Sequence, residues 1–345
     1  MPIRIRPAQA TDDDVWDAFA RAHRLGSPFH LIAWKACIQE SFGYAPYYLV
    51  AEEGESIRGV LPLFLVKSWI IGKALISTPF ATYGGVLADT AEVLSAFREE
   101  VERLAFQLNV KFVEIRNARE EQNLGFTPIS RHVIYVGPVR PVEEEILESI
   151  PRKTRRIVRK ALETPFSTRV QTDDFTTFER IYSRNLKRLG TPAFPTKYYR
   201  SLLTRFRDSI DIREVFLRGK PVAAVLTLYY QDRVFPYYGA ADMEYNADSP
   251  TTYMYYDLIR WAGKNGFRTF DFGRSKISSG SGHFKSHWGL AECPLYYEVL
   301  LLKGREIPDI TPKNPRYQLA IRLWRMLPLS VTRILGPWVV RMVPA

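Results

Sequence analysis

The stretch IREVFLRGKPVAAVLTLYY, from Ile212 to Tyr230, decides the fold because its pattern occurs twice in the chain. Two apolar runs rich in β-branched and aromatic residues flank a turn at Gly219, as in a β-hairpin. YYLVAEEGESIRGVLPLFLV, from Tyr47 to Val66, has the same pattern, with Gly54 at its turn. Self-similarity of this kind predicts that one structural unit is present in two copies.

The segments that follow the two hairpins also correspond. TYGGVLAD and YYGAADME come next, and we align Gly84 with Gly239. Helical sequence then leads into a β-rich segment in both halves: AEVLSAFREEVERLAFQLN before KFVEIR, and PTTYMYYDLIRWAGKNG before RTFDFG. This order of strand, turn, strand, strand, helix and strand resembles the centre of the GNAT acyltransferase fold.

The expected fold is therefore α/β, with two tandem GNAT-like (acyl-CoA N-acyltransferase) domains whose mixed sheets are flanked by helices. GPVRP at 137–141 interrupts the pattern and predicts the boundary. Helical sequence, VEEEILESIPRKTRRIVRKALE, opens the second half. We expect an N-terminal domain over 1–140, a C-terminal domain carrying the active site over 141–305, and a basic amphipathic tail over 306–345.

Composition bounds the class of protein. The chain has 345 residues, of which 46% are hydrophobic and 25% charged, as in globular proteins. Two cysteines do not make a disulfide framework, and no apolar run reaches the roughly 20 residues of a membrane helix. The segment MPIRIRPAQATDDD lacks the apolar core of a signal peptide. These features predict a cytoplasmic location.

The formal net charge of +11 is unevenly distributed. Arg152, Arg155, Arg156 and Arg159 recur at helical spacing, either as a solvated face or as a surface for a polyanion. From Ile310 to Ala345 six basic residues and no acidic one alternate with Leu, Ile, Val and Trp. This tail is typical of a helix at an anionic membrane, and the alternative is a helix that packs on the second domain.

The segment DFGRSKISSGSGHFKSHWG, from Asp271 to Gly289, contains three false motifs. Its DFG triplet lacks the other sequence elements of a kinase, and Phe284 stands where a Walker A loop needs glycine. His283 and His287 are four apart, but no glutamate follows the first, as a zinc site of the HExxH type requires. We expect no metal.

Four segments in the same order carry a resemblance to a known family: RKTRRIVRKA, NLKRLGTPAFPTKYY, RGKPVAAVLTL and the DFG-to-HWG segment. With these segments the chain resembles the FemABX family of non-ribosomal peptidyltransferases. The closest similarity is to the FemAB-related proteins of exosortase and PEP-CTERM envelope systems. The resemblance implies transfer of an aminoacyl group from tRNA to an amine of a cell-wall precursor, without metal and without an acyl-enzyme. It implies that Arg188 holds the precursor's diphosphate, that Lys285 lies at the reaction centre, and that Tyr237 or Tyr238 lines the substrate channel.

Residue chemistry adds to this set. A fixed cation at Lys285 would stabilise the oxyanion of acyl transfer, after a loop in which Gly280 and Gly282 let the backbone approach closely. Phe284 and Trp288 would pack one face of a short helix and hold Lys285 in position. The remaining candidates are Asp271, which would orient Arg274 or accept the amine proton, and Arg184, one helical turn before Arg188.

Donor and acceptor remain open at this stage. The pyrophosphate loop with which GNAT proteins bind acyl-CoA is absent, because ADMEYNADSPTTYMYY stands before the second-half helix. The helical hairpin that many tRNA-using family members carry is also missing, because the second half has no room for it. The donor is therefore either aminoacyl-tRNA or acyl-CoA, and the expected partners are an envelope or sugar-nucleotide precursor, tRNA and the inner face of an anionic membrane. The alternative function is a non-catalytic protein that binds a polyanionic glycan or a membrane.

Overall fold

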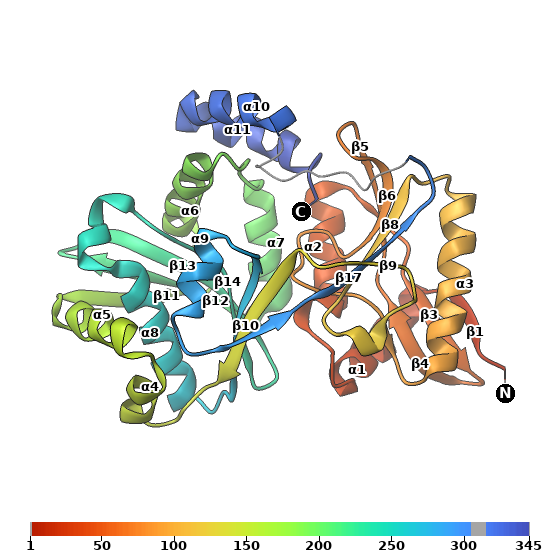
Figure 1. The fold of residues 1–345 in the computed structure, drawn as a ribbon, viewed down its shortest axis with the longest axis horizontal. Coiled ribbons are helices and arrows are strands. Elements are labelled where there is room, and N and C mark those ends of the chain that lie inside the picture. Colours follow the sequence, from red (N-terminus) through yellow and green to blue (C-terminus); the bar gives the residue numbers. More distant parts are fainter. Residues whose placement is uncertain (1, 305–314, 345) are drawn as a thin grey trace. The chain divides into compact units, whose positions relative to one another are not determined.

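Both hairpins are formed as the sequence predicts. In the second half, β12 (Ile210–Leu217) pairs antiparallel with β13 (Lys220–Tyr230), and in the first half β3 (Leu49–Glu53) pairs with β4 (Ser56–Leu61). The computed structural model describes residues 2–304 and 315–344 (Figure 1). These residues form two units, each with its own sheets and core.

The first unit comprises residues 2–131, 294–304, 315–321 and 337–344. Its four-stranded sheet has the order β1 (Arg4–Pro7), β3, β4 and β7 (Leu87–Ala88). Its six-stranded sheet has the order β2 (Ala45–Pro46), β5 (Phe64–Ser68), β6 (Gly72–Ser77), β8 (Phe112–Asn117), β17 (Tyr296–Leu301) and β9 (Thr127–Ile129). The longer helices are α1 (Asp13–Ala22), α2 (Ile32–Phe42) and α3 (Ala91–Gln107).

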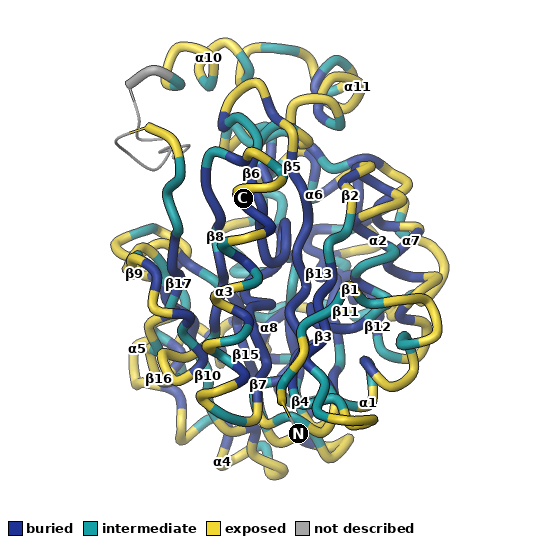
Figure 2. The backbone as a smooth tube through the Cα atoms, turned by 90° about the vertical axis from the view of Figure 1, so that its right-hand side faces the viewer, coloured by how far each residue is buried: buried dark blue, intermediate teal, exposed yellow. Residues whose placement is uncertain are grey.

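The second unit comprises residues 132–293 and 322–336. Its seven-stranded sheet has the order β11 (Phe166–Gln171), β12, β13, β14 (Arg233–Ala241), β15 (Thr269–Lys276), β10 (His132–Pro138) and β16 (Ala291–Pro294). Its helices are α4 (Glu143–Ser149), α5 (Arg152–Glu163), α6 (Thr176–Leu189), α7 (Thr196–Phe206), α8 (Pro250–Lys264) and α9 (Gly280–Ser286). The central strands of both units are buried (Figure 2).

A parallel strand pair joined by a helix occurs in each unit, which is the core of the expected repeat. β14 pairs in parallel with β15, and α8 lies between these two strands in the chain. In the same way, β6 pairs in parallel with β8, and α3 lies between them in the chain. The alignment of Gly84 with Gly239 is wrong in detail, because TYGGVLAD contributes only the short β7, which joins the other sheet. Pro62 explains the split, since it donates no backbone hydrogen bond and the chain leaves one sheet at Leu61 to enter the next at Phe64.

Two strands lie in sheets that local sequence does not indicate. β10 precedes the expected boundary at 140 but lies between β15 and β16 in the second unit. β17 follows the second unit in the chain and returns to the first, between β8 and β9. There the buried Glu298 carboxylate accepts from the amides of Leu124 and Phe126 at 2.8 and 2.9 Å, which ties β17 to this unit.

The predicted tail contains two helices, α10 (Pro315–Met326) and α11 (Leu329–Val340), and its residues 306–314 lie outside the described part of the chain. In the second unit, Arg333 pairs with the buried Glu179 at 3.0 Å. In the first unit, Tyr44 Oη donates to the Arg341 carbonyl at 2.7 Å. Nowhere in residues 2–304 and 315–344 is a helix both long and apolar enough to cross a bilayer.

Candidate functional site

A bend in β15 supplies the backbone around which the candidate site is built. Gly273 has φ of 69°, a left-handed conformation that costs glycine little because it has no Cβ. Its amide donates to Oδ1 of the buried Asp271 at 2.7 Å. The pairing with β10 shifts between Ile134 and Val136, so β15 has one extra residue here, as in a β-bulge.

Lys285 binds this bend. Its Nζ donates to the carbonyl oxygens of Gly273 and Arg274 at 3.1 and 3.2 Å. The pKa of Lys285 is lowered to about 8, mainly because the ammonium is buried. The negative charge of Asp271 raises this pKa in part, and the positive charge of Arg274 lowers it further. An ammonium held between two carbonyls can shift onto a third oxygen that develops negative charge, provided that it remains protonated.

The expectation that Gly280 and Gly282 belong to a loop before a helix is wrong. Both lie in α9, whose first turn is capped by Ser279, because the Ser279 hydroxyl accepts from the amide of Gly282 at 3.1 Å. Gly282 packs closely, and an added Cβ would lie 3.3 Å from the Lys276 carbonyl oxygen. Gly282 therefore lets α9 approach the end of β15, whereas Gly280 has open space around it, and the helix carries Lys285 to the bend.

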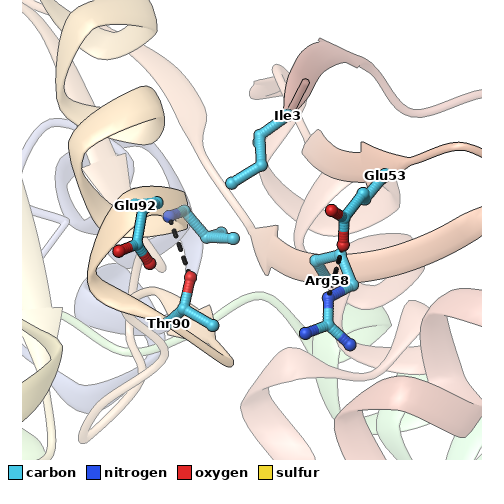
Figure 3. Close-up of a pocket in the computed structure, with 6 residues that line it drawn as sticks. Ile3, Glu53, Arg58, Thr90 and Glu92 are labelled. Atoms are coloured by element: carbon cyan, nitrogen blue, oxygen red, sulfur yellow. Dashed lines mark hydrogen bonds and ion pairs between the residues drawn. The ribbon is translucent and has the colours of Figure 1, made fainter. Parts of the chain in front are cut away.

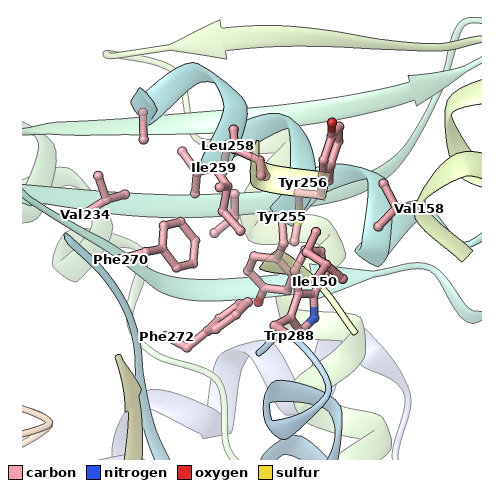
Figure 4. Close-up of a cluster of buried hydrophobic side chains, with 14 of the residues drawn as sticks. Ile150, Val158, Val234, Tyr255, Tyr256, Leu258, Ile259, Phe270, Phe272 and Trp288 are labelled. Carbon is pink, nitrogen blue, oxygen red and sulfur yellow. The ribbon is translucent and has the colours of Figure 1, made fainter. Parts of the chain in front are cut away.

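Phe284 and Trp288 fix α9 on the core, as the sequence predicts. Their ring centroids are 6.0 Å apart, and both rings face Tyr255 of α8, at 5.8 and 6.3 Å. Trp288 is buried and packs on Phe272 of β15 (Figure 4). Phe284 is partly exposed. Trp288 therefore lies in the core behind Phe284.

Tyr255 connects this group to β14. A Cβ on Gly239 would lie 2.5 Å from Tyr255 Oη, so the phenol passes directly beneath the strand at this glycine. β14 pairs with β15 only at Arg233 and Val234, and the pairing has ended before the chain reaches Tyr237. The pairing of the two strands thus ends before the part of the sheet where Tyr237, Gly239 and the β15 bend lie.

Aromatic side chains cover β14 at this point. The ring of Tyr238 lies 5.4 Å from Tyr182 of α6 and 5.3 Å from Phe194, and its hydroxyl is 3.1 Å from that of Tyr198. Burial raises the pKa of Tyr238 and of Tyr182 far above the ordinary value. Both phenols therefore stay protonated and can donate hydrogen bonds.

Arg184 and Arg188 are both exposed and lie one turn apart at the end of α6. Arg184 forms an ion pair with Asp242 at 3.5 Å, and Asp242 directly follows β14. This ion pair places α6 beside β14, the strand that carries Tyr237 and Tyr238. Arg188 donates to Asn185 at 2.8 Å within its own helix. α6 ends at Gly190, whose φ of 76° is left-handed. A glycine followed by Pro192 after helical sequence predicts such an end.

The start of α8 is poorly suited to a phosphate. Pro250 at the first helical position has no N–H, and the amides of Thr252 and Tyr253 both donate to the Ser249 carbonyl at 3.1 Å. Asp242, Glu244 and Asp248 precede the helix. Phosphate sites at helix starts use free amides and a positive field, whereas here Pro250 has no N–H, two of the next amides are engaged and the preceding side chains are acidic.

Sequence reasoning missed Gly273, Tyr182, Tyr198 and Tyr255. A signal for Gly273 was present, since a glycine within a strand pattern often marks a bulge. The three tyrosines carry no such signal, because they come from three helices and reach the strands only through tertiary packing. Tyr182 and Tyr198 contact Tyr238 of β14, and Tyr255 contacts Phe272 of β15.

The described part of the chain also has hollows outside this group. One, of about 350 Å³, borders Phe194 and lies between α6 and α11, lined by Glu179, Ser183, Thr196, Ser330 and Arg333. The other, of about 560 Å³, lies in the first unit at the start of α3, where Arg58 pairs with Glu53 at 3.6 Å (Figure 3). Within residues 2–304 and 315–344, no group of three His, Cys, Asp or Glu side chains could hold a metal ion.

Residues 149–286 match the acetyltransferase (GNAT) domain family. The matched segment lies within the second unit and ends just after Lys285. No protein of curated function matches the chain.

Solved structures of similar fold span nearly the whole chain. FemX is 16% identical with a TM-score of 0.68, covering 92% of this chain and 100% of that one. A tandem GNAT protein from the clavulanic acid biosynthesis pathway is 10% identical with a TM-score of 0.56, covering 88% and 100%. L-PGS from Bacillus licheniformis is 13% identical with a TM-score of 0.53, covering 91% and 99%. These similarities confirm the expected fold class.

Proposed function

We propose that the protein transfers an acyl or aminoacyl group onto an amine of a cell-envelope or exopolysaccharide precursor, with Lys285 at the reaction centre. The observation that carries the proposal is the position of the Lys285 ammonium, which two backbone carbonyls of β15 hold beyond the point where its pairing with β14 ends. The similarity in fold to FemX and the GNAT domain match support the same class of reaction.

In this reaction the acceptor amine attacks the carbonyl carbon of the donor. A C–N bond forms, the ester C–O or thioester C–S bond breaks, the amine loses a proton and the leaving oxygen or sulfur takes one up. The oxyanion formed between these events is stabilised by Lys285, which a single well-placed donor can do by about 3 kcal/mol. No acyl-enzyme is needed, because the amine attacks the donor directly.

Asp271 acts on the lysine through two routes. Its charge favours the ammonium form of Lys285, and its carboxylate holds the amide of Gly273, whose carbonyl binds that ammonium. We therefore assign Asp271 a positioning role, while Arg274 faces the same lysine and tunes its charge.

Arg188 and Arg184 bind the phosphate groups of the acceptor in this proposal. They extend from α6, whose Tyr182 packs on Tyr238 of β14, so an acceptor seated along the tyrosines has its phosphates near the end of that helix. Tyr237, Tyr238 and Phe284 line the path between the arginines and Lys285, and Trp288 supports Phe284 from the core.

For the donor we favour aminoacyl-tRNA over acyl-CoA. GNAT domains use acyl-CoA, whose pyrophosphate needs free amides at the start of the helix that follows the diverging strand. Here that helix begins with Pro250, after Asp242, Glu244 and Asp248. The exposed side chains of Arg152, Arg156 and Arg159 on α5 give a nucleic acid backbone an alternative contact.

The acceptor class suggests that the reaction takes place at the inner face of a membrane. α10 exposes Leu319, Leu323 and Met326, which recur at intervals of four and three and so share one helix face. The same helix exposes Arg322 and Arg325. An apolar stripe beside arginines is the composition of a helix that lies in an anionic lipid interface.

A transfer assay tests the proposal. Labelled aminoacyl-tRNA and labelled acetyl-CoA are incubated separately with the protein and with lipid-linked or nucleotide-linked envelope precursors, and label in the precursor fraction is measured. We expect transfer from aminoacyl-tRNA, and we expect Lys285→Met to lower its rate by about 10²–10³. Label transfer from neither donor would favour the non-catalytic alternative, in which the cationic face of α5 binds a polyanion.

A further inference from the structure

The turn between β5 and β6 exposes a tryptophan that the fold does not use. Trp69 is 97% exposed and its neighbour Ile70 is 38% exposed, whereas Ile71 is buried. Trp16, Trp34 and Trp288 are buried in the cores of their units. A tryptophan this exposed at the tip of a hairpin contributes nothing to packing and leaves a large apolar surface in water.

Two further segments of the first unit lie beside this turn. The Lys111 amide, just beyond α3, donates to the Lys73 carbonyl at 2.6 Å. Ser68 Oγ, at the end of β5, donates to the Met342 carbonyl at 2.7 Å. The same end of the unit therefore carries the end of α3 and the chain after α11.

Each of these segments also exposes an aromatic side chain. Phe106, in the last turn of α3, is 83% exposed, and Trp338, in α11, is 70% exposed. With Trp69 they give three large exposed aromatic residues from three segments that the hydrogen bonds bring to one end of the unit. Figure 1 shows the β5–β6 turn projecting beyond the strands that it joins.

The three segments that these hydrogen bonds join carry charge of one sign. The segments 66–73, 105–111 and 337–344 contain Lys67, Lys73, Lys111 and Arg341, and they contain no aspartate or glutamate. A surface with exposed tryptophans among basic residues combines the two features that hold peripheral proteins at anionic membranes.

We propose that this end of the first unit docks onto an anionic lipid surface, with Trp69 as its principal anchor. Tryptophan favours the headgroup region, where its ring is desolvated while its N–H keeps a polar partner. A second copy of the chain fits less well, because a symmetric contact would place these four cations against each other. A protein partner also fits less well, since lysine is depleted in protein interfaces.

This inference deepens the membrane contact proposed for α10 by adding a surface on the folded body of the protein. It does not depend on the transfer chemistry. The test uses the full chain in sedimentation with vesicles of phosphatidylcholine alone or mixed with phosphatidylglycerol. We expect binding only to the mixed vesicles, and Trp69→Ser should weaken it at least about tenfold, because a tryptophan buries a large apolar area. Lys67→Glu combined with Lys73→Glu should do the same.

Val15→Ser is the matched control, because Val15 is also an exposed apolar residue of the first unit but belongs to α1. Figure 1 shows α1 at the end of this unit opposite the β5–β6 turn. This variant should bind as the wild type does. Leu323→Ser in α10 separates the two membrane proposals. If Leu323→Ser releases the protein and Trp69→Ser does not, the inference is wrong and the tail alone binds.

Two other results would also overturn the inference. The first is that the wild-type protein does not bind vesicles that contain phosphatidylglycerol. The second is that sedimentation velocity shows a wild-type dimer that the substitution Trp69→Ser converts to a monomer. Transfer to a water-soluble acceptor should be unchanged in Trp69→Ser, so failure of docking and failure of the proposed reaction give different results.

Discussion

Lys285 Nζ lies 3.1 Å from the carbonyl oxygen of Gly273, the residue whose left-handed backbone bends β15. The bend aims two carbonyls at α9, and burial at this point lowers the pKa of Lys285 to about 8. The ammonium is therefore positioned by backbone rather than by a carboxylate ion pair, which leaves it able to bind a developing oxyanion.

The pH dependence of transfer should reflect this lysine. Lys285 loses its proton as pH rises through about 8, and the neutral amine cannot stabilise negative charge equally well. The transfer rate should therefore fall above pH 8. Asp271→Asn removes a charge that raises the pKa of Lys285, so the fall should begin at lower pH. A pH–rate profile of both proteins measures this, and coincident profiles would contradict it.

Gly273→Ala tests the bend itself. Alanine at a φ of 69° is strained, and the free energy of unfolding should fall by at least about 1 kcal/mol in urea titration. Transfer should fall as well, because the carbonyls that hold Lys285 move. Gly266→Ala is the control, since Gly266 has a φ of 80° and open space around it. It should lose similar stability and keep its activity, and equal loss of activity in both variants would count against the bend.

Arg188→Ala should affect acceptor binding more than the chemical step. If Arg188 holds a phosphate in both ground and transition states, its removal raises the acceptor KM and leaves kcat nearly unchanged. Steady-state kinetics with a phosphorylated acceptor measure this split. Lys220→Ala, at an exposed strand start, controls for the loss of a surface charge. An unchanged KM in Arg188→Ala would exclude the arginine from the acceptor site.

Residues 142–302 expressed alone should fold poorly. This fragment omits β10, which lies between β15 and β16, and so leaves both strands with an open edge. It also carries β17, whose buried Glu298 finds its partners only in the first unit. We expect aggregation and non-cooperative urea unfolding, with the full chain as the control. Cooperative unfolding of the fragment would show that β10 is dispensable.

The sequence was sufficient for the parts of the structure that depend on local pattern. The two hairpins, the crossover helices and the end of α6 at Gly190 follow from periodicity and turn residues. β10 and β17 could not be assigned, because a strand's own residues do not record which sheet it joins. Pro151 also divides the helical sequence that opens the second half into two helices, α4 and α5, and the charge pattern alone did not indicate this division.

For the site, the family resemblance indicated Lys285, Arg188 and the β14 tyrosines, while their surroundings came only from the structure. The contact between Lys285 and the Gly273 carbonyl joins a helix to a bulge and has no sequence signature. Gly280 and Gly282 suggested a loop because glycine is a poor helix former, yet the Ser279 cap and close packing on β15 favour a helix.

The most direct test is the single-turnover rate of transfer by Lys285→Met, which keeps most of the side chain and removes the charge. We predict a fall of about 10²–10³ with little change in acceptor binding. Lys285→Arg should restore little, because a planar guanidinium cannot place a compact charge at the same point. Lys264→Met, at the exposed end of α8, should behave as the wild type does. A wild-type rate in Lys285→Met would remove the lysine from the mechanism and contradict the account.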